Sequence, residues 1–173
     1  HLDKVRQELR AACAATPNVH FLDADAFVLA DPAGKPVRFL GATLWTDFLL
    51  FGAERQEEAL NAAQAYMPDY QHISTGGIDA HLLCAQDTAA LHARHKAWLA
   101  QQLAQRFDGR TVVITHMAPS MRSVEERYAT NLGSPAFASQ LDELVAQADR
   151  DAREHRDDHR DVGDGVHQEA SGR

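Results

Sequence analysis

The stretch from Arg110 to Ser120 constrains this chain more than any other. β-Branched residues fill positions 111–115, His116 follows at once, and Pro119 comes three residues later. Such a run predicts a short buried strand, and Pro119 prevents the loop after it from continuing the ladder. In α/β folds, ligands and metals bind in the loops after the carboxyl ends of strands. His116 is therefore a candidate metal-ligating residue.

Apolar spacing and turn residues place the other elements and predict the α/β class. Helices are expected over residues 2–15, 54–66 and 87–107 and from Ser134 onward, and strands over residues 19–22, 26–29, 37–45 and 111–115. The second and third strands should form a hairpin, because Pro32 and Gly34 lie between them in a turn. Asp108 and Gly109 end the longest helix and lead directly into the strand before His116, which is a typical αβ unit.

The helix over 87–107 has the clearest pattern. Asp87 or Thr88 is expected to cap it. Its inward stripe is expected to comprise Leu91, Arg94 or His95, Trp98, Leu99 and Leu103. His92 and His95 are interpreted as flanks of this amphipathic helix.

Residues 1–148 are predicted to form one domain, and residues 149–173 a polar tail. In the tail, Val162 and Val166 are the only large aliphatic residues. Such a segment buries too little apolar surface to offset its ordering entropy, so we expect it to be disordered.

Composition limits the partners and the compartment. The net charge of −8 argues against a nucleic-acid-binding face, and no apolar run approaches the roughly 20 residues that cross a bilayer. Residues 1–6 lack the apolar core of a secretory signal. Cys13 and Cys84 are too few for a disulfide framework and are expected to be free thiols in the cytoplasm.

Three ordered blocks resemble the calcineurin-like metallophosphoesterases. The first, residues 37–48, is similar to the strand and turn that many bacterial-type members carry after a Gly-Asn-His-Glu motif. The second, Thr115-His116-Met117-Ala118-Pro119-Ser120, resembles the family's Thr-His-His-Ala-Pro-Ser. The third, within residues 131–144, resembles its Asn-Pro-Ala-Phe-Ala-Ser helix start. Together the blocks span most of residues 1–148 in the family's order.

The resemblance implies part of a two-sheet sandwich flanked by helices, with two divalent metal ions (manganese, iron, zinc or similar) at the carboxyl ends of strands. Paired ions polarise phosphoryl oxygens and generate a hydroxide nucleophile. His116 matches the family's lone histidine ligand. The Asp-x-His, Gly-Asp and Gly-Asn-His motifs are expected before residue 1. The final Gly-His-x-His is replaced by the sequence from Asp149 to His155, which fits a diverged or frame-shifted terminus.

The same residues fit other arrangements. His116 without the family blocks would be an ordinary hydrogen-bonded histidine at a strand end. Ser120 and Ser123 near His116 could form a nucleophile and base, but no orienting acid is evident. His155 and His159 in the tail have the i, i+4 spacing of a zinc site on a helix, but a solvated tail explains them better. Asp23, Asp25 and Asp47 could form a carboxylate cluster, but turn and cap roles explain them better.

The function implied by the resemblance is metal-dependent hydrolysis of phosphate mono- or diesters, with this chain inactive by itself because it carries one ligand position, His116. The alternative is a non-catalytic remnant or interaction module that keeps half of the fold. An apolar sheet face would then be exposed and would favour self-association or a partner.

Overall fold

The computed structural model describes residues 1–147, and the predictions about the 149–173 tail, including His155 and His159, lie outside them. The described fold is α/β, as expected. Its main elements are α1 (Leu2–Ala14), β1 (Asp25–Ala30), β2 (Pro36–Ala42), α2 (Gln56–Tyr66), α3 (Asp69–His72), α4 (Ala85–Leu103) and β3 (Arg110–Thr115). Among the described residues there are also 3₁₀ turns at Ala53–Arg55, Met121–Ser123, Glu126–Tyr128 and Ser134–Ala136, and a helical segment at 142–147.

The three strands form one open sheet in the order β1-β2-β3. β1 and β2 pair antiparallel through the predicted hairpin, whereas β2 and β3 pair parallel. The hairpin turn is organised by Asp31, whose Oδ1 accepts hydrogen bonds from the backbone N–H groups of Ala33 and Lys35, both at 2.9 Å. The N–H of Lys35 and then that of Ala33 hold the pKa of Asp31 below its ordinary value.

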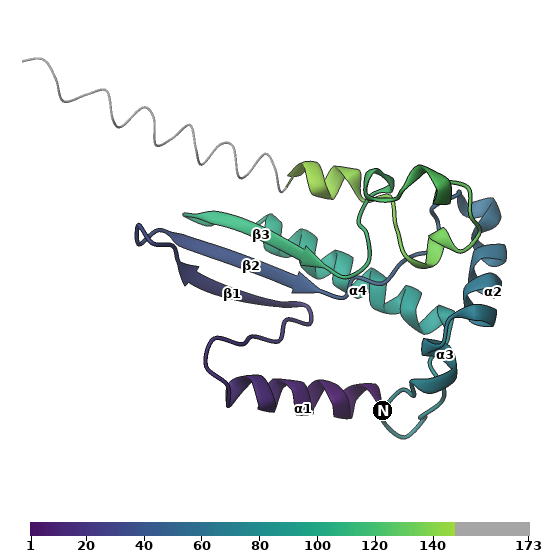
Figure 1. Cartoon of the computed structure of the whole chain (residues 1–173), viewed down its shortest axis with the longest axis horizontal. Coiled ribbons are helices and arrows are strands. Elements are labelled where there is room, and N and C mark those ends of the chain that lie inside the picture. Colours follow the sequence, from purple (N-terminus) through teal and green to yellow (C-terminus); the bar gives the residue numbers. More distant parts are fainter. Residues whose placement is uncertain (148–173) are drawn as a thin grey trace, which may run out of the picture.

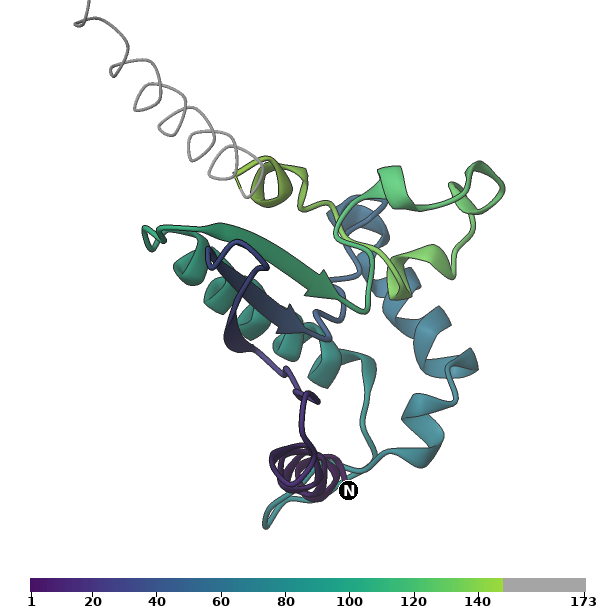
Figure 2. The same cartoon turned by 60° about the vertical axis from the view of Figure 1, so that its left-hand side comes forward.

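Helix α4 runs along one face of this sheet (Figures 1 and 2). Leu40 of β2 is fully buried there and packs with Leu99 and Leu103 of the helix. Because side chains alternate along a strand, Arg38 points to the same face. It donates to the backbone carbonyl of Gln102 at 3.1 Å. The helix is therefore attached to the sheet by both apolar packing and a buried cation.

The opposite face of the sheet is only partly covered among the described residues. Val112 and Ile114 of β3 are 39% and 49% exposed, and Leu29 of β1 is 49% exposed. The expected buried strand before His116 is thus a strand, but its burial was predicted wrongly. β3 lies at the edge of the sheet and has α4 on one side only, so alternate residues face solvent.

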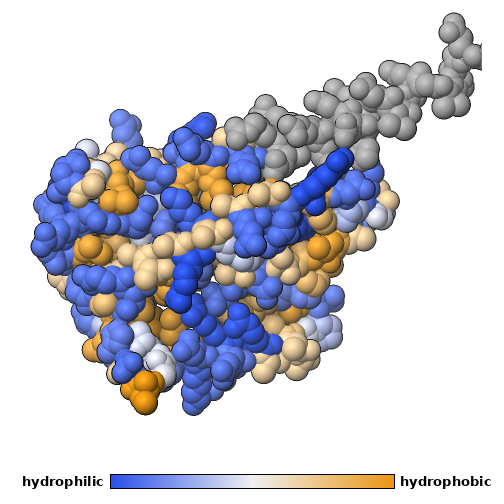
Figure 3. Space-filling model, turned by 180° about the vertical axis from the view of Figure 1, so that it is seen from behind, coloured by the Kyte–Doolittle hydropathy of each residue, from blue (hydrophilic) through white to orange (hydrophobic). Residues whose placement is uncertain are grey.

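The second and larger part of the core lies between α2, α3, the first half of α4 and the loops after β2 and β3. Its buried members include Leu44, Phe48, Tyr70, Leu83, Leu91, Met117 and Leu141. Figure 3 shows the side of the molecule opposite to that of Figure 1, where hydrophilic residues predominate and apolar ones form separate patches. Within residues 1–147, no helix has both the length and the apolar character required to cross a membrane.

Two strand predictions are wrong in their extent. Residues 19–22 form no strand; they lie against β1 and β2, where the ring of His20 stacks on Phe27 and the side chain of Leu22 packs over Gly41. The strand predicted to reach Trp45 ends at Ala42, because Leu44 and Trp45 adopt positive φ angles of 72° and 54° that a ladder cannot contain.

The helix expected from Ser134 is a single 3₁₀ turn. After it, residues around Ala138 pair with the loop after β3, where Ala118 N–H donates to Phe137 O at 2.8 Å and Ser139 N–H to Ala118 O at 3.0 Å. This pairing keeps the backbone around Ala138 in an extended conformation, so helical structure after the 3₁₀ turn begins only at residue 142 and continues to 147. The cap of α4 is also corrected: Cys84 is the N-cap and Asp87 the third helical residue of a capping box.

Candidate functional site

His116 follows β3 directly, at the carboxyl end of the strand, as expected. The last residue pair of the parallel ladder is Ala42 with Thr115. The backbone N–H of Met117 then donates to Thr43 O at 3.1 Å, so the loops that follow β2 and β3 lie against each other. The His116 side chain is exposed. A ligand in solution could reach its imidazole directly.

The loop after β2 has an unusual backbone. Leu44, Trp45 and Phe48 have φ angles of 72°, 54° and 59°, although none is glycine. Such conformations cost about 1–2 kcal/mol each for L-residues. They persist here because all three side chains are buried in the main core, with 0%, 7% and 1% exposure. Core packing therefore determines the shape of the loop beside His116.

Two histidines of α4 are buried. The burial of His95 agrees with its expected place in the inward stripe, whereas that of His92 contradicts its predicted place at the flank of the helix. His92 is 2% exposed; its Nδ1 lies 3.2 Å from Trp45 O and its Nε2 3.7 Å from Oδ2 of Asp47. Asp47 also accepts a hydrogen bond from Leu49 N–H through Oδ1, which is the turn role expected for it. The Nε2 atom of His92 has no hydrogen-bond partner among the described residues.

His95 stands one turn further along α4 and meets a different carboxylate. Its Nε2 lies 3.9 Å from Oδ1 of Asp23, whose other oxygen is 2.7 Å from Nε of Arg6. Burial lowers the pKa of His95, and the nearby Asp23 opposes that shift. Of the acidic trio considered from the sequence, Asp23 thus links α1 to α4, while Asp25 accepts from Ala26 N–H. The structure gives the three acids separate roles.

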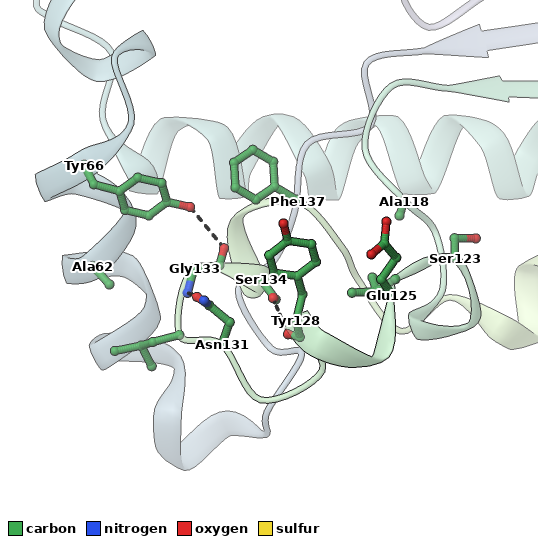
Figure 4. Close-up of a pocket in the computed structure, with 12 residues that line it drawn as sticks. Ala62, Tyr66, Ala118, Ser123, Glu125, Tyr128, Asn131, Gly133, Ser134 and Phe137 are labelled. Carbon is green, nitrogen blue, oxygen red and sulfur yellow. Dashed lines mark hydrogen bonds between the residues drawn. The ribbon is translucent and has the colours of Figure 1, made fainter.

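A groove of about 700 Å³ opens beside the loop that follows His116 (Figure 4). It is mainly apolar, and Glu125 is the only charged residue in its lining. The lining comprises Ala62, Tyr66, Ala118, Ser123, Val124, Glu125, Tyr128, Asn131, Leu132, Gly133, Ser134 and Phe137. Figure 4 shows the Tyr66 hydroxyl directed at the carbonyl of Gly133, to which it donates at 3.1 Å. Burial raises the pKa of Tyr66.

The serines near His116 are engaged elsewhere or exposed. Ser120 is 5% exposed, and its hydroxyl donates to Oδ1 of Asp142 at 2.7 Å and accepts from Arg122 N–H. Ser123 is exposed on the rim of the groove. Ser120 therefore stabilises the turn after β3, and its hydrogen bonds give no support to a nucleophile activated by His116.

A cluster of different composition lies at the start of α4. His81, Cys84 and Asp87 place one ligand atom each within 4.8 Å of one another, and no other such group of three or more His, Cys, Asp or Glu residues occurs in residues 1–147. Two side-chain contacts converge on Oδ2 of Asp87, from His81 Nε2 at 2.9 Å and Cys84 Sγ at 3.0 Å, together with the backbone N–H of Cys84 at 2.9 Å. His116 belongs to no such group there, so the described residues do not complete a dinuclear metal site around it.

The charges in this cluster are mutually adjusted. The backbone carbonyl of Asp79, followed by Asp87, raises the pKa of His81. Burial and then the Asp87 carboxylate raise the pKa of the Cys84 thiol. Partial burial of Asp87 acts to raise its pKa, but hydrogen bonds from Cys84 and His81 outweigh burial and hold the pKa below its ordinary value. These shifts favour an ionised Asp87 carboxylate beside a protonated His81 and a protonated Cys84 thiol.

The sequence predictions did not include the burial of His92 or the cluster of His81, Cys84 and Asp87, although each leaves a spacing signal in the sequence. Thr88, His92, His95 and Leu99 are spaced four, three and four residues apart, which is the spacing of an inward helix face. That signal could have identified the buried histidines. The spacing His81-x-x-Cys84-x-x-Asp87 is also visible in the sequence, but the capping role of Asp87 concealed it.

Comparisons of the chain with models of protein families, with curated proteins and with solved structures found no match.

Proposed function

We propose that the chain derives from a calcineurin-like metallophosphoesterase, with residues 1–148 belonging to one such domain. The observation that carries this proposal is the position of His116, exposed and immediately after a strand that runs parallel to β2. This is the place in the fold where a strand-end histidine can reach a metal ion. The order of the three sequence blocks adds support. The inherited chemistry would be hydrolysis of phosphate mono- or diesters.

The proposal includes the two-sheet sandwich, in which the three-stranded sheet would be one layer. The exposed Val112 and Ile114 support it, since a second sheet would pack on that face. A bound pair of divalent ions would supply a hydroxide nucleophile and polarise the phosphoryl group. The residues of this chain would contribute His116 as one ligand and the neighbouring groove as a surface for the organic part of an ester.

The chain by itself is proposed to be inactive, because one histidine cannot hold two ions against water. The test is hydrolysis of an aryl phosphate monoester and diester in the presence of Mn²⁺, with wild type compared with His116→Ala. We expect both proteins to match buffer containing Mn²⁺ alone. Turnover well above that background, abolished by His116→Ala, would contradict the inactive state and would strengthen the family proposal.

A second candidate function is supported by a different observation. Leu29, Val112 and Ile114 leave apolar side chains exposed on the sheet face opposite α4. We propose, as the alternative, a non-catalytic interaction module that associates with itself or a partner through this face. Metal analysis of the purified chain separates an active enzyme from this module: an active phosphoesterase must hold two ions that are lost in His116→Ala, whereas a remnant or module should hold at most one loosely bound ion there. The free Cys13 and Cys84 fit a location in the reducing cytoplasm.

A further inference from the structure

We propose that His81, Cys84 and Asp87 form a binding site for a thiophilic divalent cation, with Zn²⁺ as the best match. The site lies in the loop before α4 and in the first turn of that helix, the teal segment close to the N-terminus in Figure 1. It does not involve His116, and it stands whether or not the chain derives from a phosphoesterase.

The ligand atoms already stand close to the separation that zinc requires. Zn–N and Zn–O bonds of about 2.0–2.2 Å and Zn–S bonds of about 2.3 Å put tetrahedral ligand atoms roughly 3.3–3.7 Å apart. Here Oδ2 of Asp87 is 2.9 Å from His81 Nε2 and 3.0 Å from Cys84 Sγ, and all three atoms lie within 4.8 Å of one another. Small rotations of the partly exposed side chains would therefore admit an ion.

The ring of His81 is oriented as in a zinc-bound histidine. Its Nδ1 lies 2.9 Å from the carbonyl oxygen of Asp79, which can only accept a hydrogen bond, so Nδ1 carries the proton. That contact leaves the lone pair of Nε2 directed at Asp87. Backbone carbonyls commonly play this supporting role behind metal-bound imidazoles. Without a cation, His81 Nε2 and Asp87 Oδ2 at 2.9 Å share a proton between them, and a bound metal ion would replace that proton.

The backbone holds the three ligands in place. An antiparallel bridge joins Ser74 to Leu82, and Leu83 N–H donates to Ile73 O at 2.8 Å. His81 is thus fixed at the end of a short hairpin, while Cys84 and Asp87 belong to the cap and first turn of α4. Ligands carried by ordered backbone lose little entropy when they bind an ion.

The capping box explains only part of this arrangement. Cys84 N–H donates to Oδ2 of Asp87 at 2.9 Å, which satisfies the start of α4. The Cys84 side chain takes part in the same capping box, where it accepts from the backbone N–H of Asp87, but a cap requires no imidazole at Oδ2 of Asp87. A carboxylate offers about four lone-pair positions, so Asp87 can cap the helix and bind a cation together. A thiolate and a carboxylate also balance the charge of a divalent ion, and a bound metal deprotonates a coordinating thiol.

The test uses the full chain with Zn²⁺ or Co²⁺ as the probe. Cobalt bound by a thiolate gives a ligand-to-metal charge-transfer band that oxygen and nitrogen ligands do not give. We expect this band in wild type at one ion per chain. It should be lost in Cys84→Ser, and Co²⁺ affinity should fall roughly ten- to hundredfold or more in His81→Gln and Asp87→Asn.

Matched controls separate the site from general surface binding. Cys13→Ser removes the other thiol, His72→Gln removes another exposed histidine, and His116→Ala removes the proposed phosphoesterase ligand. All three should keep the band. A band that survives Cys84→Ser, or that disappears in Cys13→Ser, would overturn the proposal.

An independent readout is the alkylation of the thiols in native protein. Zn²⁺ should slow the modification of Cys84 with little effect on Cys13, and His81→Gln should remove that protection. Because His81 has 53% of its side chain exposed, its substitution is expected to leave the fold intact. Equal alkylation of Cys84 with and without Zn²⁺ would refute the site.

Discussion

Arg38 and Thr111, which are 73 residues apart in the sequence, join β2 to β3 through their side chains on the face covered by α4. Nε and Nη2 of Arg38 donate to the Thr111 hydroxyl at 3.2 and 3.0 Å. Nη1 donates to Gln102 O, and the guanidinium lies 4.8 Å from the centre of the Phe107 ring. One buried cation thus connects two strands and the end of a helix.

Replacing Arg38 with methionine should therefore destabilise the fold even though the apolar stem is kept. The loss should be about 1.5–3 kcal/mol, typical of removing hydrogen bonds to a charged group. Arg38→Lys should recover little of it, because an ammonium cannot reproduce the forked geometry. Urea unfolding measures both values. A control, Arg110→Gln, changes an exposed arginine and should cost under about 1 kcal/mol.

Positive φ angles lead to a prediction of increased stability. Ala24 has φ of 52° immediately before β1, a conformation that glycine adopts without penalty. Ala24→Gly should raise the free energy of unfolding by up to about 1 kcal/mol, the relief of strain less the added entropy of the unfolded chain. Ala26→Gly, at an exposed position inside β1, should instead lower it by about 0.5–1 kcal/mol. Equal effects of both changes would argue against strain at Ala24.

Stability should fall as the pH drops below about 6.5, the ordinary pKa of histidine. Burial lowers the pKa of His95 in the folded protein; Arg6, Arg94 and His92 act in the same direction, whereas Asp23 opposes it. As the pH falls, His95 therefore takes up a proton in the unfolded chain before it does so in the folded protein. The free energy of unfolding decreases until the pH has dropped below the pKa of His95 in the folded protein. His95→Gln should flatten this part of the profile of urea midpoints against pH. An unchanged slope would assign the effect to other groups.

Self-association should depend on the exposed sheet face. Val112→Lys combined with Ile114→Lys should make the chain more monomeric in sedimentation velocity experiments and reduce the binding of a hydrophobic dye. Association through this face would remove apolar surface from water, which is favourable by about 25 cal/mol per Å². Two lysine charges on the face would oppose that burial. Val5→Lys is the matched control, since Val5 is 47% exposed on α1, away from the sheet. A wild-type monomer that binds no dye would refute the interaction module.

Local sequence patterns predicted the elements whose formation depends on neighbouring residues. The hairpin followed from Pro32 and Gly34, and the strand before His116 from its β-branched run, as β1, β2 and β3 confirm. The exposure of β3 could not be predicted in this way, because it depends on the position of the strand at the sheet edge. Where Ser134 was expected to open a helix, the bridge from Ala118 to Ala138 overrides local propensity.

The same distinction between local patterns and tertiary contacts applies to the candidate sites. His116 could be placed at a strand end because that requires only the adjacent strand. The approach of His92 to Asp47 and of His95 to Asp23 could not, since each joins α4 to a loop at least 45 residues earlier. The inward stripe of α4 was expected to be apolar except for Arg94 or His95. In fact, its histidines contact carboxylates that only the tertiary fold brings near.

Helix α1 has no buried residue, and this has a consequence for the order in which the molecule opens. Arg6 and Asp23 attach it through an ion pair, Leu2 packs against the main core, and Leu2 N–H donates to Ser74 O at 2.8 Å. The two side chains of this pair are only 19% and 10% exposed, so salt screens their attraction little, and the helix itself buries little apolar surface. Mild denaturant should thus release α1 as a separate cooperative unit, with early amide exchange in residues 2–14, while the sheet stays protected.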